Sequence, residues 1–314
     1  MPRRRPFRFG VQSGLSGASK PGDWADLARR VEALGYSSLS IPDHFTDQLA
    51  PVPAMTAAAA ATTTLKVGAL VFGNDYRHPV VLAKEIATID LLSDGRVEFG
   101  LGAGWMTTDY RQAGIGIDPP GPRIERMGEA LEICRGLWGD GAFSFDGGHY
   151  RVAELDGQPK PVQRPHPPIL IGGGRPRVLA MAGREADIVG INPSLRAGEV
   201  GPEAVADVVA ERVDEKVGWV RDAAGDRFDA IELNLLVQFA MVVDNRMELL
   251  EATAPAFGLT AEQAMGSPYV LVGTVDEICE DLRTWRDRWG ISYWVVHVEV
   301  VDALAPVVER LSGT

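Results

Sequence analysis

Residues 91–105 read Leu-Leu-Ser-Asp-Gly-Arg-Val-Glu-Phe-Gly-Leu-Gly-Ala-Gly-Trp, and this stretch decides the fold. A helix is expected to end at Asp94-Gly95, because glycine readily takes the left-handed conformation that closes a helix. The run from Arg96 to Leu101 predicts a strand, and residues 102–104 follow it directly. Glycines at a strand end bring bare backbone to one edge of a sheet, where a flat ring or a phosphate can lie. Close packing of neighbouring strands would account for the same glycines.

The glycines at positions 100, 102 and 104 resemble a dinucleotide-binding fingerprint, but their spacing differs from that motif. The motif also needs an amphipathic helix directly after its glycines. Residues 107–118 are polar and contain Gly114 and Gly116, so no such helix is expected there. These observations exclude a Rossmann dinucleotide site.

Strand and helix patterns alternate on both sides of this stretch. Strands are expected at residues 7–11, 37–41, 65–72, 96–101, 169–171, 187–191, 231–243 and 293–298. Each strand has a helical partner, and the strands are rich in Val, Ile and Leu, as in parallel sheets buried on both faces. We therefore predict a (β/α)8 TIM barrel, with a doubly wound open sheet as the alternative.

We expect one domain over residues 1–314 with an insertion after the fourth βα unit. The insertion covers about 143–168, where a hairpin signal at 146–148 precedes five prolines. We expect it to lie over one end of the sheet.

Composition limits the possible partners. The 314 residues carry a net charge of −12, which argues against nucleic acid and anionic membranes as partners. No apolar run approaches the ~20 residues of a membrane span. The basic start at residues 1–5 has no apolar segment behind it, so we expect no signal peptide and a cytoplasmic protein. The two cysteines fall in helical patterns and the histidines lack paired ligand spacing, so no metal site is proposed.

The most unusual residues follow predicted strands, where barrel enzymes keep their active sites. Asp43-His44 comes after the second strand. The imidazole of His44 could donate a proton to an anion that develops on a ring. The alternative is a purely structural role for both residues, in which Asp43 caps a helix and His44 bonds to the backbone.

Residues 172–177, Gly-Gly-Gly-Arg-Pro-Arg, follow the fifth strand. A helix is expected to begin at Pro176, so its free N–H groups and positive dipole end suit a phosphate. Arg175 and Arg177 would add charge-assisted hydrogen bonds. These bonds would contribute more than the helix dipole, whose interaction with an anion is worth ~0.3–1 kcal/mol. A tight turn with two solvent-facing arginines is the alternative.

Taken together, the motifs resemble the luciferase-like superfamily of flavin and deazaflavin enzymes, over nearly the whole chain. They look closest to the actinobacterial branch of coenzyme F420-dependent oxidoreductases. The resemblance implies a (β/α)8 barrel, a homodimer, and a deazaflavin in the pocket at the strand ends. It rests on residues 7–11, 41–44, 74–79, 92–96, 102–105, 168–174 and 184–187.

The resemblance also implies roles for individual residues. Asp43 would contact the ring side of the cofactor, and His44 would lie at the pyrimidine edge as proton donor. A bulge after the third strand, often with a cis peptide, would fall near Ala69-Leu70 and back the ring. The residues expected to line the ring or its ribityl chain are Phe72, Ala103 and Gly104, and those expected at the phosphate are Gly173, Gly174, Arg175, Arg177 and Val178.

One departure from the family pattern concerns the substrate. Sugar-phosphate dehydrogenases of this superfamily carry a glutamate after the glycine of the fourth strand, and this chain has Trp105 there. Their phosphate-binding lysines also have no evident counterpart, which argues against a sugar-phosphate substrate. Trp105 would form an apolar wall of a substrate pocket, or pack at the rim under the insertion.

These residues predict an oxidoreductase that transfers a hydride between coenzyme F420 and a small organic substrate. An FMN-dependent monooxygenase on the same barrel is the alternative, because FMN carries the same ribityl phosphate. A barrel that binds a flavin-like ligand without catalysis is a third hypothesis.

Overall fold

The parallel strands form the predicted barrel. The computed structural model describes residues 5–14, 20 and 22–314. Its main sheet runs β3-β2-β1-β13-β10-β9-β8-β5-β4, and an additional β3–β5 pairing closes it. Because β4 continues β3, the closed sheet has eight parallel strands, which confirms the (β/α)8 fold over the open sheet. The strands are β1 (Arg8–Gln12), β2 (Ser38–Ile41), β3 (Lys66–Ala69), β4 (Phe72–Gly73), β5 (Val97–Gly102), β8 (Ile169–Gly173), β9 (Ile188–Ile191), β10 (Glu232–Leu236) and β13 (Ile291–His297).

The chain divides into two compact units. Unit 1 contains Met1–Gln12, Val31–Ser38 and Gly172–Thr314, and unit 2 contains Ser13–Arg30 and Leu39–Ile171. The basic residues 1–4 lie outside the described residues. No helix in the described part of the chain is long and apolar enough to cross a membrane.

Unit 2 contains the stretch that predicts the fold. Every residue of β5 is buried, and β5 pairs with β3, β4 and β8. The preceding helix ends at Leu92, and Asp94 and Gly95 turn the chain at φ +55° and +76°, as the sequence predicts. The helices of this unit are most of α1 (Asp23–Ala33), α2 (Pro51–Ala61), η1 (Asn74–Tyr76), α3 (Pro79–Leu92), α4 (Thr107–Ala113) and α5 (Pro120–Trp138).

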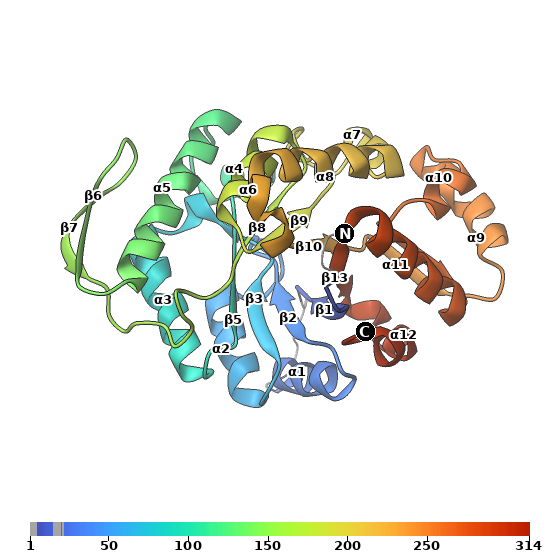
Figure 1. Ribbon diagram of the computed structural model, residues 1–314, viewed down its shortest axis with the longest axis horizontal. Helices are drawn as coiled ribbons and strands as arrows, with labels where there is room; N and C mark the ends of the chain where they lie inside the picture. The colour runs from blue at the N-terminus through green and yellow to red at the C-terminus, as the bar shows by residue number, and fades with distance from the viewer. Residues whose placement is uncertain (1–4, 15–19, 21) are drawn as a thin grey trace. The chain divides into compact units, whose positions relative to one another are not determined.

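The insertion differs from its expected position. Its hairpin, β6 (Ala142–Asp146) and β7 (Arg151–Asp156), lies along the outer side of α5 instead of over the strand ends (Figure 1). Gly136 of α5 leaves room for the ring of Phe143, because an added Cβ would be 2.2 Å from it. In the hairpin turn, the Tyr150 hydroxyl accepts a hydrogen bond from Asn74 Nδ2 at 3.4 Å.

Unit 1 contributes β1, β9, β10 and β13 to the barrel. The strand predicted at 231–243 is two strands, because β10 ends at Leu236 and β11 (Phe239–Val242) pairs with β12 (Val270–Gly273) in a separate sheet. Two helices follow β9 with a break at Asp207, whose carbonyl accepts from the buried Lys216 Nζ. The helices are α6 (Pro176–Glu185), α7 (Pro202–Ala206), α8 (Ala210–Ala224), η2 (Gly225–Ala230), α9 (Arg246–Thr253), η3 (Ala254–Phe257), α10 (Ala261–Met265), α11 (Val275–Trp289), η4 (Val298–Val300) and α12 (Ala305–Leu311).

Candidate active site

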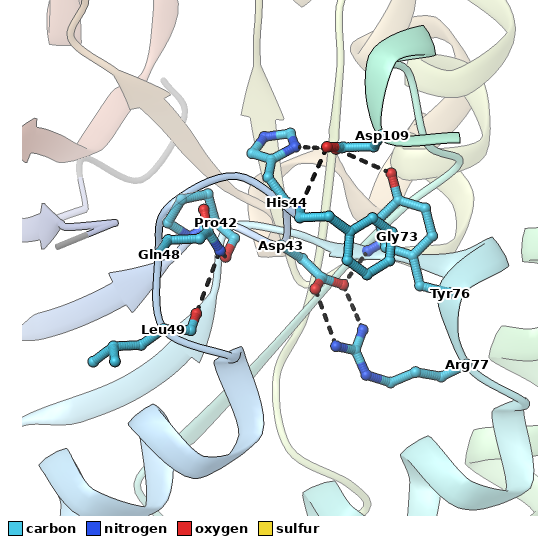
Figure 2. A network of polar contacts seen from close by, with 10 residues as sticks. Pro42, Asp43, His44, Gln48, Leu49, Gly73, Tyr76, Arg77 and Asp109 are labelled. Carbon is cyan, nitrogen blue, oxygen red and sulfur yellow. Dashed lines mark hydrogen bonds and ion pairs between the residues drawn. The ribbon is translucent and has the colours of Figure 1, made fainter. Parts of the chain in front are cut away.

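The candidate site lies in unit 2, at the carboxyl ends of β2, β4 and β5. Pro42-Asp43-His44 follows β2, and the Gln48 side chain fixes this loop by donating to the Pro42 carbonyl at 2.6 Å. Figure 2 shows that Asp43 and His44 turn to different partners, although they are adjacent in sequence. Asp43 faces Arg77, and His44 faces Asp109.

Asp43 has a structural role that the sequence did not reveal. Its side chain is 3% exposed and forms a two-point ion pair with Arg77, in which Nη2 donates to Oδ1 at 3.0 Å and Nη1 donates to Oδ2. The Gly73 N–H also donates to Oδ2 at 2.9 Å. Three donors thus occupy a buried carboxylate. Asp43 therefore joins the end of β2 to the segment after β4, and its expected contact with a cofactor ring stays a prediction.

His44 makes its ring contacts with α4 and the preceding loop. Its Nδ1 lies 2.6 Å from Asp109 Oδ2, and the side chains are 20% and 1% exposed, respectively. The Trp105 ring meets the imidazole edge-on, with centroids 5.6 Å apart. His44 and Trp105, predicted separately, therefore lie together and are both partly exposed.

Asp109 is the site residue that sequence reasoning missed. It accepts from the Phe45 N–H at 3.2 Å and from the Tyr76 hydroxyl at 3.3 Å, besides its contact with His44. Residues 107–118 were expected to form no amphipathic helix, yet a short α4 begins at Thr107 and presents Asp109 to the site. The acidic residue in the first turn of a helix was the available signal.

A second Asp–Tyr contact lies beside the first. The Tyr110 hydroxyl donates to Asp75 Oδ2 at 2.8 Å, and Arg126 Nε donates to Asp75 Oδ1 at 2.8 Å. The Tyr76 and Tyr110 rings lie 5.5 Å apart. Burial, followed by the neighbouring carboxylates, raises the pKa of both tyrosines, so their hydroxyls stay protonated donors.

The bulge after β3 is present, one residue beyond its expected position. The cis peptide joins Leu70 and Val71, which are both partly exposed. Ala69 is 3% exposed and Phe72 is fully buried, and their expected contacts with a ring stay predictions. Val71, which follows the cis peptide, is more exposed than either of them.

The glycines of β5 explain how closely this bulge packs. A Cβ at Gly100 would lie 2.0 Å from the Ala69 carbonyl oxygen, and one at Gly102 would lie 2.6 Å from Val71 Cγ2. Close strand packing therefore accounts for these two glycines. Ala103 and Gly104 are partly exposed, as a ring-facing position requires, and the Arg123 guanidinium donates to both of their carbonyls.

The predicted phosphate turn lies in unit 1. The α6 helix begins at Pro176 with Arg175 as its N-cap, and Arg175 and Arg177 are exposed while Val178 is partly buried. Gly174 is buried, and a Cβ there would lie 2.3 Å from the Pro193 carbonyl oxygen, so the close packing requires glycine. At Gly173 the added atom would meet Val178 at 2.3 Å. The turn therefore has the expected helix N-terminus and two cationic side chains.

The fold is a (β/α)8 barrel whose polar side chains gather at the carboxyl ends of β2, β4 and β5, where barrel enzymes keep their active sites. The chain belongs to the luciferase-like monooxygenase family, whose profile matches residues 6–265.

Several relatives are named for their cofactor. An F420-dependent glucose-6-phosphate dehydrogenase of Amycolatopsis mediterranei is 27% identical over 306 residues, covering 88% of each chain. An FMNH(2)-dependent dimethylsulfone monooxygenase of Pseudomonas putida is 36% identical over 128 residues, covering 41% of this chain and 35% of the relative. An uncharacterized protein of Mycobacterium tuberculosis is 37% identical over 187 residues, and this chain spans only 65% of its length.

A solved structure supports the fold. An F420-dependent secondary alcohol dehydrogenase, solved with an F420-acetone adduct, aligns over 98% of this chain and 99% of its own. The TM-score is 0.76 at 18% sequence identity, so this likeness concerns the fold alone.

Proposed function

We propose that this chain is a coenzyme F420-dependent oxidoreductase that transfers a hydride between the deazaflavin and a small organic substrate. The observation that carries the proposal is the pairing of a partly exposed His44 with Trp105 at the end of β5, beside the Leu70–Val71 bulge. The match of 88% of each chain to an F420-dependent relative supports F420 as the cofactor.

The side chains of unit 2 fit a flat, partly apolar ring. Leu70 and Val71 offer apolar surface, and Ala103 and Gly104 are partly exposed at the end of β5. His44 supplies a polar nitrogen next to this surface. In unit 1, Arg175, Arg177 and the first N–H groups of α6 are the groups that a phosphate needs, and we propose that turn as its binding site.

When bound, F420 supplies the central ring that accepts or donates the hydride. His44 would exchange a proton at Nε2, where charge changes as the hydride moves. Trp105 would exclude water and present an apolar wall to the substrate. Asp43 and Arg77 would hold the loop that carries His44 in place. We propose no contribution from the insertion, because its hairpin packs along α5.

The competing function is an FMN-dependent monooxygenase, which the Pseudomonas putida relative favours over part of the chain. FMN shares the ribityl phosphate, so the arginine turn does not discriminate between the two cofactors. F420 differs in its acidic polyglutamyl tail and in its inertness toward oxygen.

Equilibrium titration of the purified protein with F420 and with FMN tests the proposal. We expect saturable F420 binding at micromolar concentrations and weaker binding of FMN. Arg175→Ala should weaken F420 binding by about 10-fold, the loss of one charge-assisted hydrogen bond. Lack of F420 binding at micromolar concentrations, or FMN-dependent oxygen consumption, would overturn the proposal.

A further inference from the structure

We propose that Asp109 is a positioning residue for His44, which keeps a proton on Nδ1 and leaves Nε2 as the nitrogen that exchanges protons with bound molecules. The tautomer assignment rests on the protein alone. Its catalytic consequence rests on the proposed function.

The first argument is the short contact. An ionised carboxylate has no hydrogen to donate, so the His44 Nδ1 that lies 2.6 Å from Asp109 Oδ2 must be the donor. In a neutral imidazole the other nitrogen then carries only a lone pair. No described residue forms a hydrogen bond with Nε2. Figure 2 shows this second nitrogen on the side of the ring away from Asp109.

The second argument is that Asp109 cannot easily turn away. The Phe45 N–H holds Oδ1, and the Tyr76 hydroxyl shares Oδ2 with His44. With a side chain only 1% exposed, Asp109 has little water to replace these donors. A buried carboxylate with three donors keeps one orientation, because breaking any bond leaves a desolvated charge.

The third argument is a pair of matching dipeptides, Asp75-Tyr76 in η1 and Asp109-Tyr110 in α4. Each tyrosine donates to the aspartate of the other dipeptide, so two hydrogen bonds cross between the segments. We call these four residues the Asp–Tyr brace. Arg126 of α5 fixes its far end through Asp75. The brace holds α4 against η1, and with it the carboxylate that faces His44.

Among the residues that the structure describes, no other charged group contacts the imidazole. Asp43 is adjacent in sequence, but Arg77 and the Gly73 N–H occupy its carboxylate. Asp75 is paired with Arg126. The titratable groups near the His44–Asp109 pair are therefore Tyr76, Tyr110 behind it, and Asp43, which is paired with Arg77.

Nitrogen-15 NMR of histidine side chains tests the tautomer directly. The chain has five histidines, so selective labelling gives few signals, and His44→Gln assigns the one of interest. At a pH where the imidazole is neutral, we expect a protonated Nδ1 and an unprotonated Nε2 in ligand-free protein. The opposite tautomer, or an equal mixture of the two, would overturn the proposal.

Two hydroxyl deletions form a matched pair for the brace. Tyr76→Phe removes a donor from Asp109, and Tyr110→Phe removes the equivalent donor from Asp75. We expect Tyr76→Phe to broaden or shift the His44 signals and Tyr110→Phe to leave them in place at similar loss of stability. Equal effects would show that the brace supports only the fold, and would contradict a positioning role.

Asp109→Asn removes the carboxylate with little change in volume. We expect loss of the fixed Nδ1–H tautomer, F420 affinity within 2-fold of the native protein, and a fall in kcat/KM of about 10²-fold, the lower end of what general acid–base catalysis contributes. An unchanged tautomer in a folded Asp109→Asn protein would refute the inference.

The two proposals can fail separately. Failure to bind F420 would refute the proposed function and leave the ligand-free tautomer unaffected. If Asp109→Asn were not to fold, the native tautomer and the tyrosine pair would still decide the inference.

Discussion

Replacing Gly104 with alanine tests how the end of β5 is built. Gly104 has φ +76°, and a Cβ there would lie 1.9 Å from the Tyr110 hydroxyl oxygen. An alanine in this left-handed conformation costs about 1–2 kcal/mol. Tyr110 would also have to move and give up its 2.8 Å hydrogen bond to Asp75, a bond to a charged group that is worth about 1.5–3 kcal/mol. We expect Gly104→Ala to lower the free energy of unfolding by about 3–5 kcal/mol.

Gly114 provides the matched control. It has φ +69°, and an added Cβ would meet nothing within 4 Å. Gly114→Ala therefore carries the backbone cost alone, about 1–2 kcal/mol. The change in the unfolded chain is the same for both substitutions, so it cancels in the comparison.

Thermal unfolding followed by circular dichroism measures the difference. The extra cost of about 1.5–3 kcal/mol, at about 2 °C per kcal/mol for a chain of this size, should make Gly104→Ala unfold about 3–6 °C below Gly114→Ala. Equal midpoints for the two variants would refute the close contact between Gly104 and Tyr110.

Three further predictions concern titratable groups. Burial raises the pKa of Asp281 to about 6, above its value near 4 in the unfolded chain, so the folded state binds the extra proton and stability falls as pH rises from about 4 to 6. Asp281→Asn should remove that slope and raise the free energy of unfolding at pH 7 by about 1–3 kcal/mol. Chemical denaturation at pH 4 and pH 7 measures the slope, and a slope that persists in the variant would disprove this. Burial raises the pKa of Cys134 to about 12 and also raises the pKa of Cys279, so a disulfide reagent should react with neither thiol until denaturant is added. Reaction of either thiol in the folded protein would contradict the packing. Although burial raises the pKa of Glu129, three backbone N–H donors at residues 148–150 lower it overall, so its support of the hairpin turn should be present above pH about 4 and lost below it. Glu129→Ala should speed amide exchange in that turn by about 10-fold at pH 7, and unchanged exchange would show that the turn does not depend on this carboxylate.

The fold could be predicted because its signals are local. The turn at Asp94-Gly95 and the buried strand after it each depend on a few neighbouring residues. The strand predicted at 231–243 was wrong for a related reason, because apolar alternation does not show that the chain leaves one sheet for another after Leu236.

The site was harder to predict because its contacts are distant in sequence. Asp109 reaches His44 across 65 residues, from a seven-residue helix with too few apolar positions to show a period. The role of Asp43 depends on Arg77, 34 residues away, and on burial that no local pattern reports. The expected role of Phe72 came from the resemblance alone, which does not report that its side chain is buried where the chain breaks between β3 and β4.

A structure of the protein in complex with F420 tests the central claim most directly. We predict that the deazaflavin ring lies against Leu70 and Val71, with His44 Nε2 within hydrogen-bonding reach of the ring or the substrate and Nδ1 still bound to Asp109. A ring bound elsewhere, or an imidazole that has left Asp109 to donate through Nδ1, would contradict the account.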